Sequence, residues 1–206
     1  MMVRSGICWL AYLDLYGFSD ETKRADPKEI AAKLSFIHER LLPASGGSNV
    51  TAFAFSDSII LCVDAEKDTN KSLDTIIQKT IELQNVAIAK RYVFRGSIAY
   101  GTMTFGPNIC IGKPLLRAHA VEQNLPIPLV VLPASELVEC LPNHGRPTAE
   151  IRTKTGITRV VPLLPRPKEP YLRVAGEKLD ELLVSGPDKV ALAWSDLISF
   201  VRNLAD

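Results

Sequence analysis

An acid interrupts the apolar, aromatic-rich stretch Tyr12-Leu13-Asp14-Leu15-Tyr16-Gly17-Phe18-Ser19. Residues 7–15 have the length and composition of a buried strand, and Gly17 ends it. A lone carboxylate is costly to bury unless it is paired or binds a metal ion. Asp14 is therefore the first candidate functional residue, although a strand-end Asp is also common as a helix cap or salt-bridge partner.

A second acid, Asp57, lies in Phe55-Ser56-Asp57-Ser58-Ile59, at the turn between two short apolar segments. Residues 50–55 and 58–63 have the pattern of two strands joined tightly. Asp at a hairpin turn is often explained by local hydrogen bonding alone. Magnesium, however, takes one or two carboxylates together with substrate phosphates. If the two strands meet the first one, the two acids predict a cation between them.

The order of the predicted elements indicates an α+β fold of the ferredoxin-like βαββαβ type, followed by a further βαβ unit. A capping pattern at Asp26-Pro27-Lys28-Glu29 predicts the first helix. The other elements are a helix over 72–90, strands over 92–100 and 109–111, a helix over 114–124 and a strand over 127–132. We expect the helices to pack on one face of the sheet, with Asp14 and Asp57 as neighbours.

Beyond residue 141 the composition shifts towards Pro, Arg and Lys. We predict a hairpin over 149–153 and 157–161, a proline-rich connector over 162–170 and a last helix after residue 188. The chain is thus divided into a catalytic domain, 1–141, and a C-terminal extension, 142–206, that packs on the core.

Composition excludes several classes of protein. The 206 residues carry 24 Lys+Arg and 23 Asp+Glu, a net charge of +1, which is not that of a nucleic-acid binder. Cys8, Cys62, Cys110 and Cys140 lie far apart, as expected for reduced thiols rather than a zinc site. No apolar run approaches the roughly 18 residues of a membrane span. We expect a cytoplasmic protein that contacts neither membrane nor nucleic acid.

Two further features suit a phosphate ligand. The backbone N–H groups of Gly17-Phe18-Ser19 follow a strand and lead towards a helix, so they can face an anion. Arg95 interrupts the apolar strand Val93-Phe94-Arg95-Gly96-Ser97-Ile98 and calls for an anionic partner. The alternative for Arg95 is an edge-strand position that faces solvent.

These motifs resemble, in the same order, those of class III nucleotidyl cyclases. Residues 14–19 are similar to the signature D-[IL]-x-G-F-[ST], and residues 55–59 resemble the second metal-binding hairpin. Residues 95–101 are similar to the strand whose arginine binds the triphosphate, and residues 112–122 resemble the helix that follows. The resemblance extends over residues 7–132.

The resemblance implies a site shared across a head-to-tail homodimer. Asp14, Asp57 and the Leu15 carbonyl would hold two Mg²⁺ or Mn²⁺ ions. The nucleoside triphosphate would be bound by Gly17, Phe18, Ser19, Phe53, Phe55 and Arg95.

The sequence departs from the family at the Asn and Arg that stabilise the transition state. Those positions fall on Leu116 and Ala120, or on Leu115 and His119 in a register shifted by one residue. Arg117 and His119 lie on the same predicted helix and are the candidate catalytic substitutes. A solvated surface position is the alternative for Arg117.

A second departure concerns the base. The Lys of purine-specific members is replaced by Phe53, and their purine-reading acid by Ile109. This pattern resembles the pyrimidine cyclases of the bacterial Pycsar anti-phage system, which implies UTP or CTP as substrate. Three alternatives remain open: Phe53 as plain hairpin core, a purine cyclase, and a catalytically silent cyclase-like domain that binds a nucleotide.

Overall fold

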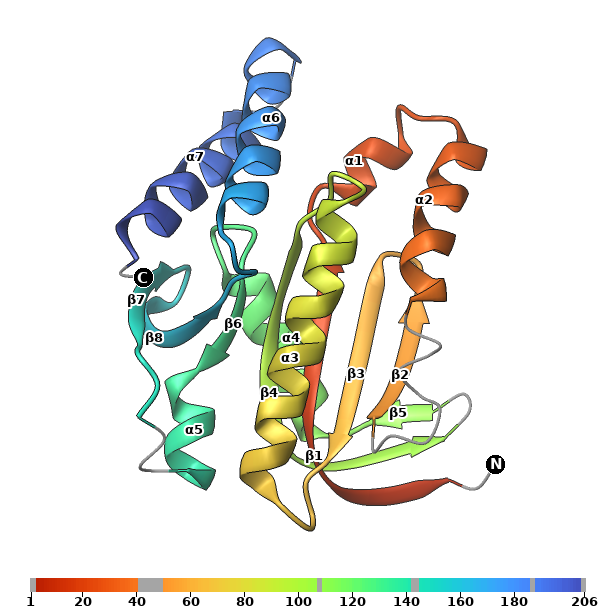
Figure 1. Cartoon of the computed structure of the whole chain (residues 1–206), viewed down its shortest axis with the longest axis vertical. Coiled ribbons are helices and arrows are strands. Elements are labelled where there is room, and N and C mark those ends of the chain that lie inside the picture. Colours follow the sequence, from red (N-terminus) through yellow and green to blue (C-terminus); the bar gives the residue numbers. More distant parts are fainter. Residues whose placement is uncertain (1–2, 41–49, 107–108, 142–144, 186–187, 205–206) are drawn as a thin grey trace.

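The computed structural model describes residues 3–40, 50–106, 109–141, 145–185 and 188–204. Within them the strands form one eight-stranded sheet in the order β2-β3-β1-β4-β6-β8-β7, with β5 paired to β4 outside this path (Figure 1). The strands are β1 (Arg4–Leu15), β2 (Val50–Phe55), β3 (Ser58–Asp64), β4 (Phe94–Gly106), β5 (Ile109–Ile111), β6 (Val130–Pro133), β7 (Ala149–Thr153) and β8 (Gly156–Leu163).

The predicted βαββαβ order is confirmed. Strand β1 lies at the centre of this part of the sheet and pairs antiparallel with β3 on one side and β4 on the other. Strand β4 pairs parallel with β6. The helices are α1 (Phe18–Thr22), α2 (Pro27–Glu39), α3 (Thr69–Ile88), α4 (Lys113–Asn124), α5 (Ala134–Cys140), α6 (Glu169–Ser185) and α7 (Asp188–Asn203).

The prediction that the helices pack on one face is wrong. Helices α2 and α3 cover the face that carries Trp9 and Leu13 of β1. Helix α4 covers the opposite face (Figure 1). On that face Cys8 and Leu10 belong to one apolar cluster with Ala118 of α4. Since successive strand residues point to opposite faces, a strand that is apolar at every position needs a cover on both sides.

The C-terminal hairpin continues the same sheet, because β8 pairs antiparallel with β6. Helices α6 and α7 lie beside it and contribute Tyr171, Trp194 and Leu197 to a second apolar cluster (Figure 1). Helix α6 was not predicted, because it follows a proline-rich segment. Its own proline, Pro170, lies in the first turn, where the missing N–H costs nothing. Helices α1 and α5 were also missed, and both are short.

Among the described residues, no helix combines the length and the apolar character needed to cross a bilayer.

Candidate functional site

The structure brings Asp14 and Asp57 together at one end of the central strands. Asp14 is the register partner of Ser58, the residue that follows Asp57. The Leu15 N–H donates to the Asp57 carbonyl oxygen at 3.2 Å, so the hairpin tip lies beside the end of β1. The Ser58 hydroxyl donates to Asp14 Oδ1 at 3.2 Å and orients that carboxylate.

The electrostatics of this pair are unfavourable without a counterion. The pKa of Asp14 is raised from 3.8 to about 6, first by burial and then by the negative charges of Asp57 and Glu122. The Ser58 hydrogen bond and the Arg95 charge act in the opposite direction but do not prevail. The two acids therefore form a patch where a cation lowers the free energy of the ionised state.

Arg95 does not neutralise the pair, although it is the register partner of Asp14 on β4. Its Nε donates to Oε1 of Glu122 at 2.5 Å, and Glu122 is fully buried on α4. The guanidinium carbon also lies 5.2 Å from the centre of the Tyr16 ring. Because the Arg95 side chain is only 19% exposed on a central strand, the solvent-facing edge position is excluded.

Tyr12 is a site residue that the sequence analysis missed. It lies two residues before Asp14, and therefore on the same face of β1. Its hydroxyl lies 3.2 Å from Ser58 Oγ, the group that binds Asp14. Burial raises the pKa of Tyr12. The His119 ring packs edge-on against the Tyr12 ring, with 5.2 Å between centres.

The structure does not bring Arg117 to the acids. Its Nε and Nη2 donate to the two carboxylate oxygens of Glu136 at 2.8 and 3.0 Å, and Nη2 also donates to the Tyr100 carbonyl. Tyr100 is the register partner of Trp9, which precedes Asp14 by five residues. At about 3.3 Å per residue, that is roughly 16 Å along β1. Arg117 instead ties α4 to α5 and β4, and its side chain remains 43% exposed, as the surface alternative predicts.

Gly17 supplies the turn that the sequence predicts after β1. Its φ of 82° is left-handed, a conformation that glycine adopts without strain. Its carbonyl accepts hydrogen bonds from the amides of Asp20 and Glu21. The amides of Phe18 and Ser19 lie in the first turn of α1 and so have no helical acceptor. The Phe18 side chain packs into the core, whereas Ser19 is exposed.

The two aromatic residues of the hairpin differ in burial. Phe53 is half-buried and packs against the cluster under α4 that contains Leu10 and Met103. Phe55, near the hairpin tip, is 86% exposed. Ile109 is also largely exposed. A role for Phe53 in the hairpin core therefore has support, and it does not exclude contact between one edge of its ring and a ligand.

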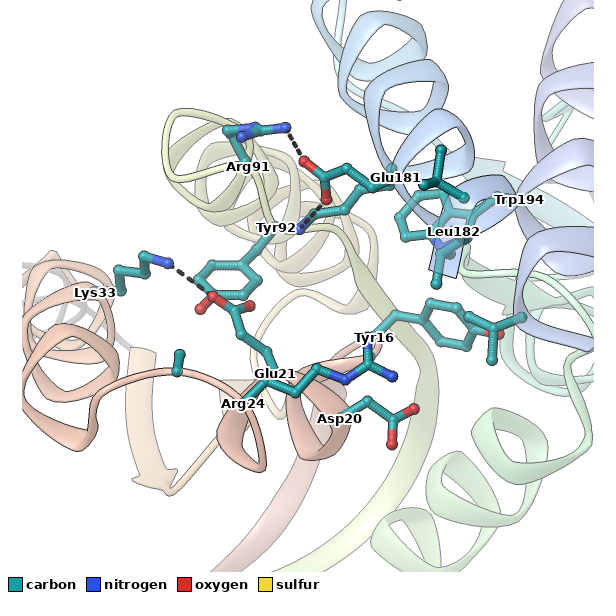
Figure 2. A pocket seen from close by; sticks show the side chains of 15 residues that line it. Tyr16, Asp20, Glu21, Arg24, Lys33, Arg91, Tyr92, Glu181, Leu182 and Trp194 are labelled. Carbon is teal, nitrogen blue, oxygen red and sulfur yellow. Dashed lines mark hydrogen bonds and ion pairs between the residues drawn. The ribbon is translucent and has the colours of Figure 1, made fainter. Parts of the chain in front are cut away.

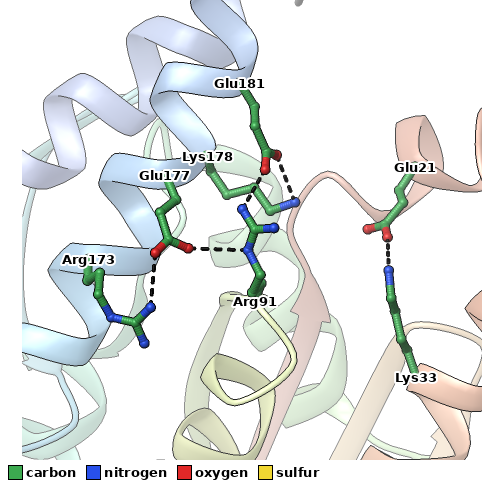
Figure 3. Close-up of polar contacts among 7 residues, drawn as sticks. All are labelled: Glu21, Lys33, Arg91, Arg173, Glu177, Lys178 and Glu181. Atoms are coloured by element: carbon green, nitrogen blue, oxygen red, sulfur yellow. Dashed lines mark hydrogen bonds and ion pairs between the residues drawn. The ribbon is translucent and has the colours of Figure 1, made fainter.

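A hollow of about 700 Å³ lies beside the Gly17 turn, between the α1–α2 region and the C-terminal helices (Figure 2). Neither Asp14 nor Asp57 lines it. Ion pairs hold most of its charged side chains: Lys33 binds Glu21 at 2.7 Å, and Arg91 binds two acids of α6 (Figure 3).

One wall of this hollow connects to the acid site. The Tyr16 ring lies 5.6 Å from the Trp194 ring of α7, and the Arg95 guanidinium lies over the same Tyr16 ring. The C-terminal helices therefore cover the end of the sheet next to the candidate site.

The oxygen ligands near Asp14 and Asp57 suit a hard cation. Within the described ranges, no group of three or more His, Cys, Asp or Glu side chains is arranged to hold a metal ion. Zinc needs such a group, but magnesium takes one or two carboxylates and completes its octahedron with water and substrate oxygens. Two carboxylates and the Leu15 carbonyl fit the second description.

No protein-family model and no curated protein matches the sequence. Several solved structures are similar. The guanylate cyclase domain of RhGC from Catenaria anguillulae, in complex with GTP, has a TM-score of 0.60 and 12% identity, over 79% of this chain and 99% of that one.

The adenylyl cyclase CyaB from P. aeruginosa has a TM-score of 0.61 and 12% identity, over 82% of this chain and 99% of that one. A dimeric guanylyl cyclase domain of the RhoGC fusion protein from Blastocladiella emersonii has a TM-score of 0.61 and 10% identity, over 78% and 97%. Similarity at such low identity demonstrates the fold alone. This chain therefore has the class III nucleotidyl cyclase fold.

Proposed function

We propose that this chain is a nucleotidyl cyclase that converts a pyrimidine nucleoside triphosphate, UTP before CTP, into its 3′,5′-cyclic monophosphate and pyrophosphate. Asp14, Asp57 and the Leu15 carbonyl would hold two Mg²⁺ or Mn²⁺ ions. When bound, these ions activate the ribose 3′-hydroxyl and neutralise the leaving pyrophosphate, as in other two-metal displacements. A homodimer would complete the two sites, and the product would act as a second messenger in anti-phage defence.

One observation carries this proposal: two carboxylates meet at the end of the central strands, and neither has an ion pair among the described residues. Burial and the charge of Asp57 together raise the pKa of Asp14 to about 6. Arg95, the register partner of Asp14, is bound to Glu122 instead. A structural ion pair would not bring two acids close together, whereas a site for divalent cations uses such carboxylates as ligands.

The chain's own residues have distinct parts in this proposal. Ser58 fixes one oxygen of Asp14 and leaves the other for a ligand. The first-turn amides at Phe18 and Ser19 would donate to phosphate oxygens, since they have no helical acceptor. Arg95 would contact the triphosphate only after releasing Glu122.

The pyrimidine preference rests on the hairpin side chains. Phe53 and Ile109 stand where purine-specific relatives carry a Lys and an acid, and neither side chain can form a hydrogen bond with a purine edge. Strong discrimination between bases needs buried polar groups that match one base and are left unpaired by another.

The test is incubation of the purified chain with Mn²⁺ and each of ATP, GTP, CTP and UTP, with mass spectrometry of the products. We expect cyclic UMP to form fastest, and Asp57→Asn to form none. Asp180→Asn, a change of an exposed acid on α6, is the matched control and should retain activity. Cyclic AMP or cyclic GMP as main product would identify a purine cyclase.

A specific observation favours a second candidate, a catalytically silent domain that binds a nucleotide. Both arginines among the candidate site residues are held by acids of the same chain, Arg95 by Glu122 and Arg117 by Glu136. Thermal stabilisation by a triphosphate without any cyclic product would establish this alternative. Absence of both stabilisation and product would refute both candidates.

A further inference from the structure

Three of the four cysteines gather under α4, although they lie far apart in the sequence. Cys8 of β1 and Cys62 of β3 are both 1% exposed in the cluster that contains Leu10 and Met103, and Cys110 of β5 packs against it. All are reduced. Nothing in the proposed reaction uses them.

The strand register explains how the first two meet. Asp64 is the partner of Cys8, and Cys62 precedes Asp64 by two residues, so the two thiols are diagonal neighbours on one face. Strand β5 brings the third thiol: it has only three residues and pairs with the end of β4. Cys8 and Cys62 belong to one apolar cluster and Cys110 packs against it, so the three side chains lie close together.

The two thiols of the Cys62–Cys110 contact differ in access and acidity. Cys110 is half-exposed, whereas Cys62 is buried. The hydrogen bond with Cys62 lowers the pKa of Cys110, and the same contact is the main cause of a raised pKa at Cys62. A thiol that is accessible, prone to ionise and adjacent to a second thiol has the properties of an oxidation-sensing cysteine.

We propose that Cys110 and Cys62 form a peroxide-sensitive pair, with Cys110 as the attacking thiol and Cys62 as the resolving thiol. The substrate class is a hydroperoxide. The Cys110 thiolate attacks the terminal oxygen, so that an S–O bond forms and the O–O bond breaks. The leaving hydroxide or alkoxide takes up a proton.

The Cys62 sulfur then attacks the sulfenic acid of Cys110. An S–S bond forms, the S–O bond breaks and water leaves with the Cys62 proton. Two thiols lose two electrons and one hydroperoxide gains them, so the steps balance. The disulfide links β5 to β3 and fixes the β4–β5 hairpin next to the start of α4.

The test treats the intact, fully reduced chain with increasing hydrogen peroxide and then removes the peroxide. One portion is weighed without alkylation, and a second portion is alkylated for peptide mapping. We expect a mass loss of about 2 Da per chain, the signature of one disulfide. Non-reducing peptide mapping should join the peptides of Cys62 and Cys110. A disulfide between Cys8 and Cys62, or one that includes Cys140, would overturn the proposal, and so would the absence of any disulfide.

Variants test the order of events. Cys140→Ser is the matched control, because Cys140 is also half-exposed but donates to the Glu136 carbonyl. This variant should still lose 2 Da on oxidation. Cys110→Ser should abolish it. Cys62→Ser should leave a sulfenic acid on Cys110 that reacts with dimedone. A dimedone adduct that forms faster on Cys140 than on Cys110 would contradict the assigned roles. Because the wild-type peptide map needs no substitution, poor folding of a variant leaves the test intact, and neither measurement depends on cyclase activity.

Discussion

Replacement of Asp14 by Asn should stabilise the metal-free protein at alkaline pH, even though it removes a proposed ligand. Folding raises the pKa of Asp14 from 3.8 to about 6, chiefly through burial and the Asp57 charge. An acid whose pKa is raised by folding is more protonated in the folded chain than in the unfolded one. Its ionisation therefore lowers the free energy of unfolding as the pH rises from about 4 to about 6, and the loss is complete above that range.

The magnitude follows from the shift. About two pKa units correspond to roughly 3 kcal/mol at 1.36 kcal/mol per unit. Asp14 is partly exposed, so solvent screening reduces the expected gain to about 2 kcal/mol. In a chain of this size, 1 kcal/mol moves the Tm by about 2–4 °C. Asp14→Asn should thus raise the Tm by roughly 4–8 °C at pH 8.

The measurement is thermal unfolding of both proteins in a chelator, at pH 8 and at about pH 3, well below the unfolded-state pKa of Asp14. At the acidic pH the Asp14 carboxyl is mostly neutral in both states, so the gain should nearly vanish. Asp180→Asn is the control for loss of one charge and should stay within about 0.5 kcal/mol of wild type. A gain of equal size at both pH values would refute the electrostatic argument, as would destabilisation of the variant at pH 8.

Four further outcomes are expected. Millimolar Mn²⁺ should raise the Tm of the wild-type chain at pH 8, because a ligand of the folded state stabilises it by mass action. It should not raise the Tm of Asp14→Asn or Asp57→Asn. Equal shifts in all three proteins would exclude the acid pair as the metal site. Arg95→Ala should cost about 3–5 kcal/mol in urea unfolding, because it leaves Glu122 buried and unpaired; a cost below about 1 kcal/mol would show that the pair contributes little. If Arg95 binds phosphate, Glu122→Gln should raise the nucleotide affinity measured by calorimetry, because the neutral amide holds the guanidinium less strongly. Weaker binding would argue against phosphate binding by Arg95. Arg91→Ala should cost about 1 kcal/mol or less, since its pairs with α6 are half-exposed; a larger loss would mean that these pairs hold the C-terminal helices in place.

The local part of the site was predictable from the sequence. The alternating strand pattern and the turn residues predicted the hairpin that carries Asp57. Because side chains alternate between the two faces of a strand, a shift of one residue in register would have placed Asp14 on the opposite face. The same two-residue period places Tyr12 on the face of β1 that carries Asp14, so Tyr12 could also have been predicted as a neighbour of the site. Helices on both faces of β1 could also have been predicted, because Cys8-Trp9-Leu10-Ala11 is apolar at every position.

The partners of the arginines were not predictable. Glu122 follows Arg95 by 27 residues and Glu136 follows Arg117 by 19, and each pair joins different elements. Such contacts depend on how helices are placed on the sheet, which no local pattern encodes. The sequence indicated that Arg95 needs an anionic partner, but not that the chain supplies one itself.

These pairings determine what the site attracts. Around Asp14 the chain presents two further negative charges, from Asp57 and Glu122, against the single positive charge of Arg95. The local field is therefore negative, and a free triphosphate would be repelled from it. Divalent cations bound there would reverse that sign, and their own charge would then be the largest in the site. A nucleotide should accordingly bind as its metal complex or after the metal. Arg95 would be available to the phosphates only when the positive charge of the metal ions has weakened the ion pair between Arg95 and Glu122.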